Sequence, residues 1–188
     1  MDPATRGAGI VLAAGEGRRF GGPKQLAELD GRPLVEHALA ALRGAGLDRA
    51  IVVLGARADE VRAAADLSGA AIAVCPEWAE GLSASVRCGL AAAGEVDEVV
   101  VLLADQPFIT PAAIARVRAA PGPAARAVYG GAPGHPVVLR RDVLARAREL
   151  RGDRGFRDLL GDAAQVECGD LADPQDIDTR EDLEVVRR

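Results

Sequence analysis

Four short segments of the chain are almost wholly apolar, and they limit the possible folds more than any other feature of the 188 residues. They span 10–13, 50–54, 70–74 and 98–104, the last of which reads EVVVLLA. A strand without polar alternation is buried on both faces, as in a parallel sheet that helices cover on each side. We therefore predict a doubly wound, mostly parallel α/β sheet with a Rossmann-like fold, formed as one domain over residues 1–188.

Helical patterns fill the intervals between these strands. Helices are expected from Pro33 to Gly44, through 61–65, over about 82–93 and from Pro111 onward. The second half of the chain is less regular, and here we expect short strands at 125–129 and 136–139 around a loop at 130–135.

A glycine-rich loop follows the first strand and reads GEGRRFGGPK over 15–24. Glycine tolerates positive φ and lets the backbone approach a ligand, so several N–H groups can face one anion while Arg18, Arg19 and Lys24 add charge. Lys24 is the one lysine among 23 basic residues, and its compact ammonium offers a phosphate a point charge that a planar guanidinium does not. The alternative is a surface lysine in a flexible turn.

This loop differs from two well-known phosphate-binding patterns. No G-x-x-x-x-G-K-[ST] runs through it, and G-E-G-R-R-F lacks the third glycine of a dinucleotide-binding fingerprint. The second strand is followed by Gly55, Ala56 and Arg57, which offer no acid for a ribose, although Arg57 suits a 2′-phosphate. An NAD(P)H-dependent oxidoreductase therefore stays open as an alternative function.

Carboxylates follow the most hydrophobic strand and recur towards the end of the sequence. Asp105 comes directly after 98–104, where Mg²⁺ could bind it together with water and substrate phosphates. A turn cap ahead of Pro107 is the alternative. Asp176 and Asp178 alternate as on one face of an extended segment, so either could be a second metal ligand. Asp178 with Thr179 also suits the cap of a final helix.

Composition excludes several classes of function. The net charge of −5 and the pI near 5.1 argue against non-specific nucleic-acid binding. No apolar run approaches ~20 residues, so no membrane span is expected, and the first residues do not resemble a signal peptide. Three cysteines without a C-x-x-C pair suit a reducing compartment. We expect a cytoplasmic protein whose cysteines are inert, buried thiols.

Four segments carry a specific resemblance: LAAGEGRRFGGPKQL from Leu12, GLSASVRCGL from Gly81, LLADQPFITP from Leu102 and DIDTREDL from Asp176. With GHPVVL at 134–139 and GDRGFRDLL at 152–160, they resemble the molybdenum cofactor cytidylyltransferases, a branch of the MobA-like nucleotidyltransferases. The resemblance covers essentially the whole chain. Gly17 stands where this branch often has serine, and in that respect the loop is similar to that of a sugar-nucleotide enzyme.

The resemblance implies roles for the matching residues. Arg19 and Lys24 are implied to be catalytic contacts of a triphosphate, and Asp105 a catalytic Mg²⁺ ligand, with Asp178 as the second carboxylate. The implied nucleotide pocket adds Leu12, Ala13, Ala14, Gly15, Gly17, Gly81, Ser83 and Ser85. The implied acceptor contacts are Gly134, His135 and Pro136, although His135 could be purely structural. Arg154, in a basic cluster interleaved with acids, is a further candidate contact whose alternative is a solvated helical face.

The implied reaction transfers CMP from CTP to the terminal phosphate of molybdopterin and releases pyrophosphate. Ala14 stands where guanylyl-transferring relatives tend to carry glycine, and its methyl group takes space that a larger purine needs, which favours CTP over GTP. A different phosphate acceptor stays open. A third reading is a chaperone that delivers a finished cofactor, with an apo-molybdoenzyme as its partner and no pyrophosphate release.

Overall fold

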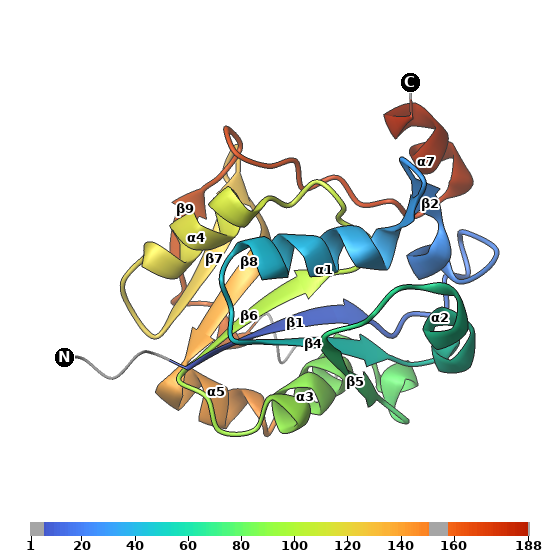
Figure 1. Ribbon diagram of the computed structural model, residues 1–188. Coiled ribbons are helices and arrows are strands. Elements are labelled where there is room, and N and C mark those ends of the chain that lie inside the picture. Colours follow the sequence, from blue (N-terminus) through green and yellow to red (C-terminus); the bar gives the residue numbers. More distant parts are fainter. Residues whose placement is uncertain (1–5, 151–157, 188) are drawn as a thin grey trace.

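A seven-stranded sheet runs through the molecule in the order β5-β4-β1-β6-β8-β7-β9 (Figure 1). The computed structural model describes residues 6–150 and 158–187. β5, β4, β1 and β6 are parallel neighbours, which confirms the predicted α/β fold with a mostly parallel sheet. The strands are β1 (Gly7–Ala13), β4 (Arg49–Leu54), β5 (Ala70–Val74), β6 (Glu98–Leu103), β7 (Ala124–Tyr129), β8 (Ala132–Arg140) and β9 (Ala164–Glu167).

Helices cover both faces of this sheet (Figure 1). α1 (Leu34–Gly44) and α4 (Pro111–Ala119) lie on one face, and α3 (Leu82–Ala93) and α5 (Arg141–Ala147) lie on the other. Along β1, Ile10 and Leu12 belong to the hydrophobic cluster under α3 and α5, whereas Val11 and Ala13 belong to the cluster under α1 and α4. The strand shows no polar alternation because successive side chains enter different apolar layers.

Shorter elements surround these layers. They are the hairpin β2 (Glu28–Leu29) and β3 (Arg32–Pro33), the 3₁₀ turns η1 (Lys24–Leu26) and η2 (Trp78–Glu80), and the helices α2 (Ala58–Ala64) and α7 (Arg180–Val186). Pro33 ends this hairpin and directly precedes α1, one residue before the observed helix start. Within the described ranges, no helix is both long and apolar enough to cross a membrane.

The predicted loop at 130–135 is wrong, because most of it belongs to β8. The turn is made by Gly130 and Gly131, which have φ of 58° and 84°, and two adjacent positive-φ residues are what a tight hairpin needs. Ala132 and Pro133 already pair with β7, so β8 runs antiparallel to both of its neighbours. The sequence GAPGHP resembles a loop because glycine and proline dominate it.

β1 lies at the point where the strand order changes direction. From β1 the chain continues to β4 and β5 on one side, and then returns to β6 on the other. Ligands of open α/β sheets bind beyond the carboxyl ends of the strands at such a point. The glycine-rich loop leaves β1 and Asp105 follows β6 at this same edge, so the fold brings together the two halves of the site that the sequence indicated.

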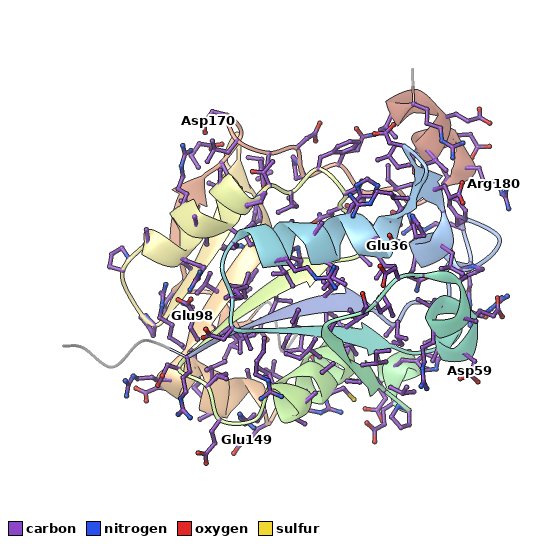
Figure 2. The ribbon with its side chains drawn as sticks, in the orientation of Figure 1. Glu36, Asp59, Glu98, Glu149, Asp170 and Arg180 are labelled. Atoms are coloured by element: carbon purple, nitrogen blue, oxygen red, sulfur yellow. The ribbon has the colours of Figure 1, made fainter. Side chains whose placement is uncertain are left out.

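Glu98 is a buried charge at the opposite end of β6 (Figure 2). Its side chain is 6% exposed and accepts hydrogen bonds from Arg118 at 2.7 Å and Arg140 at 2.9 Å. The two guanidinium groups also donate hydrogen bonds to backbone carbonyls, so Glu98 and its two partners connect α4 and β8 to the start of β6. A buried carboxylate of this kind stabilises the fold only while both of its partners remain.

We predict that Glu98→Gln destabilises the protein by roughly 3 kcal/mol, because it leaves two half-buried guanidinium groups without a counter-charge. Asp170→Asn is the matched control, since it removes the carboxylate of an exposed pair with Arg116 and should change stability little. Urea unfolding of both variants checks this. Equal, small effects of the two substitutions would contradict the structural role of Glu98.

Candidate active site

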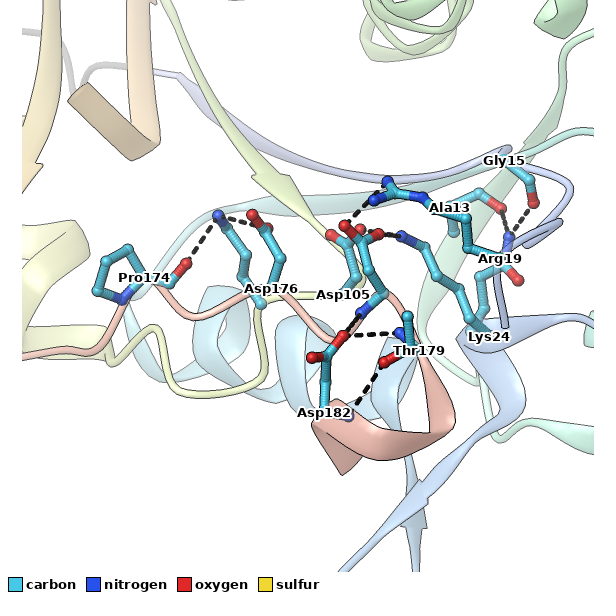
Figure 3. Close-up of polar contacts among 12 residues, drawn as sticks. Ala13, Gly15, Arg19, Lys24, Asp105, Pro174, Asp176, Thr179 and Asp182 are labelled. Atoms are coloured by element: carbon cyan, nitrogen blue, oxygen red, sulfur yellow. Dashed lines mark hydrogen bonds and ion pairs between the residues drawn. The ribbon is translucent and has the colours of Figure 1, made fainter. Parts of the chain in front are cut away.

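The ammonium of Lys24 lies between two carboxylates (Figure 3). It is hydrogen-bonded to Asp105 Oδ2 and donates to Asp178 Oδ1 at 2.8 Å. The Lys24 and Asp105 side chains are only 18% and 17% exposed, so solvent screens this contact poorly. Arg19, which is largely exposed, reaches the other oxygen of Asp178 at 2.9 Å. Four predicted residues from three distant segments therefore meet at one point.

The glycine-rich loop places Lys24 there by folding back on itself. The Gly21 N–H donates to the Gly17 carbonyl at 3.0 Å, and Gly17 has φ of 71°. A Cβ at Gly17 would lie 2.0 Å from the Gly22 carbonyl oxygen, so a side chain at this position would force the loop open. The chain then enters η1, whose first residue is Lys24.

The segment that contains Asp178 is anchored to the end of β6. The Ile177 N–H donates to the Asp105 carbonyl at 2.9 Å, and the Ile177 side chain is fully buried. Thr179 and Asp182 form a capping box at the start of α7, and Asp182 also accepts from the Asp178 N–H. Thr179 thus caps the helix, which leaves the Asp178 carboxylate available to Lys24 and Arg19.

Asp176 takes a different partner from Asp178. It accepts a hydrogen bond from Gln106 Nε2 at 2.9 Å, and the same amide donates to the Pro174 carbonyl. Partial burial of its carboxyl group, followed by the nearby charge of Asp105, raises the pKa of Asp176 above its usual value. Of the two carboxylates that the sequence left open, Asp178 is the one in contact with Lys24.

The charge of Lys24 is secured by the same arrangement. Burial opposes the ammonium charge, but attraction to Asp105 and hydrogen bonds to both carboxylates outweigh it, so the pKa of Lys24 is raised. Lys24 therefore stays charged near neutral pH and can neutralise either the carboxylates or an incoming phosphate.

A cavity of about 290 Å³ opens beside Lys24 at the carboxyl ends of β1 and β6. Its lining includes eight predicted residues, namely Leu12, Ala13, Ala14, Gly15, Lys24, Gly81, Ser85 and Asp105. Ser83 is fully buried and does not line this cavity. Gly17 does not line it either, and its role is in the conformation of the glycine-rich loop.

The wall of this cavity also contains Trp78 and Gln25, which were not predicted from the sequence. Gln25 holds the exit of β1 by donating to the Ala13 and Gly15 carbonyls at 2.7 and 2.6 Å.

A second cavity, of about 550 Å³, shares Leu82 and Leu103 with the first. Gly134 and His135 line it, together with Gln106, Arg126 and Asp176. Pro136 is buried within β8 and is not part of this lining, and Arg154 lies outside the described residues. Burial, with a smaller effect of Arg126, lowers the pKa of His135 to about 4, so its imidazole is neutral at pH 7.

The donor atoms beside Lys24 suit a hard divalent cation. Asp105 and Asp178 both contact one nitrogen, so their oxygens already converge on a volume the size of a cation. Carboxylate oxygens are the ligands that Mg²⁺ and Mn²⁺ prefer. The residues present therefore fit such an ion, provided that Lys24 moves away.

Comparisons with known proteins identify the family of this chain. A family model described as the MobA-like NTP transferase domain matches residues 9–167, so the chain belongs to this family and is a nucleotidyltransferase. The chain is 34% identical in sequence to nicotine blue oxidoreductase of Paenarthrobacter nicotinovorans, and the alignment covers 93% of each chain. Rv0371c of Mycobacterium tuberculosis H37Rv has a TM-score of 0.84 at 33% identity, covering 98% of this chain and 99% of that one. The manganese complex of Rv0371C has a TM-score of 0.80 at 31% identity, with 97% and 98% covered.

His135 generates a prediction on pH. Its pKa is near 6.5 in an unfolded chain and about 4 in the folded protein, so the unfolded state binds more protons between these values. The free energy of unfolding should therefore fall as the pH is lowered, by roughly 1–2 kcal/mol between about pH 6.5 and 5 from this group.

The comparison of wild type with His135→Gln isolates this effect. Urea unfolding at several pH values should give a smaller slope for the variant in this range. Identical slopes would show that His135 titrates normally in the folded state.

Proposed function

We propose that this MobA-like NTP transferase moves CMP from CTP to the terminal phosphate of molybdopterin, with Mg²⁺ as its cofactor. An acceptor phosphate oxygen attacks the α-phosphorus of CTP, a new P–O bond forms, the bond to the β-phosphate oxygen breaks, and pyrophosphate leaves. The observation that carries the proposal is the Lys24 ammonium between Asp105 and Asp178, in the lining of a cavity that shares Leu82 and Leu103 with a second cavity.

The chain supplies positioning and charge to this reaction. Lys24 and Arg19 leave the carboxylates when the nucleotide binds and contact the phosphates, where they stabilise the developing negative charge. The cytidine base and ribose occupy the cavity between Ala14, Gly15 and Gly81, and the methyl group of Ala14 disfavours a purine. No general base is needed, since a phosphate monoester is largely ionised near pH 7.

Asp105 and Asp178 would hold the divalent cation once Lys24 has moved. When bound, Mg²⁺ neutralises phosphate charge and brings acceptor and nucleotide together. Two facts support this assignment: the convergence of the two carboxylates and the manganese in the Rv0371C complex.

The second cavity is the proposed acceptor pocket. It offers a neutral imidazole at His135, the amide of Gln106 and the guanidinium of Arg126 beside one wall of the nucleotide cavity. Such a mixture of neutral hydrogen-bonding groups and one cation suits a flat heterocycle that carries a phosphate. If the protein also delivers the finished cofactor to an apo-molybdoenzyme, the same pocket would hold that cofactor after nucleotidyl transfer.

An NAD(P)H-dependent oxidoreductase is the alternative, and the name of the Paenarthrobacter relative is the observation that favours it. In dinucleotide-binding sites the glycine loop opens directly into a helix whose N-terminus meets the pyrophosphate. Here the loop leads to η1 and the β2–β3 hairpin before α1 begins, and Arg57 is paired with Glu60 at 2.6 Å. These features favour nucleotidyl transfer.

A pyrophosphate-release assay tests the proposal. The purified protein should release pyrophosphate from CTP, and less from GTP, only with both Mg²⁺ and molybdopterin present. NADPH should neither bind nor be oxidised. Pyrophosphate release with another phosphate acceptor would support nucleotidyl transfer but show that molybdopterin is not the acceptor. Binding of the molybdenum cofactor without any pyrophosphate release would favour the chaperone function.

We predict that Asp105→Asn lowers transfer by about 100-fold or more, because it keeps the size of the side chain and removes the charge. Binding of CTP without Mg²⁺ should change little. Asp178→Asn should lose less transfer activity. Asp176→Asn, which changes the neighbouring carboxylate that accepts from Gln106, should lose the least. Initial rates over a range of Mg²⁺ concentrations check the order. Mg²⁺-dependent activity of Asp105→Asn at the wild-type level would overturn the metal assignment.

A further inference from the structure

Two cysteines and a glutamate form a cluster outside the carboxylate site. The Cys75 and Cys88 sulfurs and a Glu77 carboxylate oxygen all lie within 4.8 Å of one another. Cys75 is fully buried, Cys88 is half-buried and Glu77 is exposed, so the three donors lead from the interior to the surface. Without a C-x-x-C pair in the sequence, these cysteines were expected to be inert, buried thiols, and Cys88 is in fact half-buried.

The backbone around the cluster is held in place. The Cys75 N–H donates to the Leu54 carbonyl at 2.8 Å, which extends the pairing of β5 with β4 by one residue. The Trp78 N–H donates to the Cys75 carbonyl at 3.4 Å and the Glu80 N–H donates to the Glu77 carbonyl at 2.9 Å, so hydrogen-bonded turns hold the segment that carries both ligands. Cys88 lies on α3, so its position is fixed by a helix packed on the sheet.

We propose that Cys75, Glu77 and Cys88 bind a thiolate-preferring divalent cation such as Zn²⁺, with a fourth coordination position open to solvent beside Glu77. Zinc–sulfur bonds of about 2.3 Å in a tetrahedral site place two sulfurs about 3.8 Å apart, which small side-chain rotations can reach from the observed arrangement. Two thiolates and a carboxylate differ in kind from the all-oxygen pair Asp105 and Asp178. The chain thus offers separate sites to a soft and a hard cation.

The position of this site gives it an effect on the nucleotide cavity. Cys75 and Glu77 precede η2, which begins with Trp78, and Trp78 and Gly81 line that cavity. A cation bound to Cys75, Glu77 and Cys88 would join this segment to α3, which also contributes Ser85 to the lining. The proposal does not depend on the identity of the nucleotide or of the acceptor.

Titration of the reduced, metal-free protein with Co²⁺ tests the site, because thiolate ligands give cobalt an intense sulfur-to-metal charge-transfer band in the near ultraviolet. The wild-type protein should develop this band as it binds one Co²⁺. Added Zn²⁺ should displace the cobalt and abolish the band, whereas excess Mg²⁺ should leave it unchanged. The emission of Trp78, which is the one tryptophan of the chain, should change at the same stoichiometry.

Variants separate this site from others. Cys88→Ser should lose the band, and Glu77→Gln should keep it with at least about tenfold weaker binding. Cys168→Ala, which removes the third thiol, should keep the wild-type cobalt band and affinity. Asp105→Asn should also keep this band, although its transfer activity is lost. Thermal unfolding shows whether each variant is folded. No charge-transfer band in the wild type, a band that persists in Cys88→Ser, or a Cys75–Cys88 disulfide in place of cobalt binding would each overturn the proposal.

Discussion

The ion pairs of Lys24 with Asp105 and Asp178 hold the functional edge of this molecule together. They connect the loop after β1, the end of β6 and the segment before α7, which are far apart in the sequence. Arg180 adds a further link by stacking over the Phe20 ring at 5.3 Å. A single half-buried ammonium therefore keeps two carboxylates close that would otherwise repel each other. We propose that these same two carboxylates bind a divalent cation.

Much of the fold could be predicted because its strands are buried on both faces. The runs that contain Ile10 and Val101 show no polar alternation, and this pattern specifies a parallel sheet between two helical layers. β8 was predicted only over 136–139, and its first residues were missed, since Pro133 and Gly134 are unfavourable in an isolated strand and this part of β8 depends on pairing with β7. Tertiary pairing overrode local preference there.

The candidate site was predictable to the extent that its residues follow strand ends. Lys24 and Asp105 have this local signal, and the fold brings them together. The choice between Asp176 and Asp178 depends on how Ile177 is anchored, which no sequence spacing specifies. Trp78 reaches the cavity, and Cys75 reaches Cys88, only because β5 ends beside α3. Contacts of this kind arise from the packing of elements and have no signature along the chain.

We propose that Asp105 and Asp178 exchange Lys24 for a divalent cation when the nucleotide binds. A crystal structure with Mn²⁺ and a CTP analogue whose α–β bridging oxygen is replaced by a methylene group tests it most directly, because manganese can be located by its anomalous scattering. We expect an anomalous peak in contact with both carboxylates and a Lys24 Nζ that has moved to within hydrogen-bond distance of a phosphate oxygen. Lys24 still seated between Asp105 and Asp178, with manganese bound elsewhere, would contradict it.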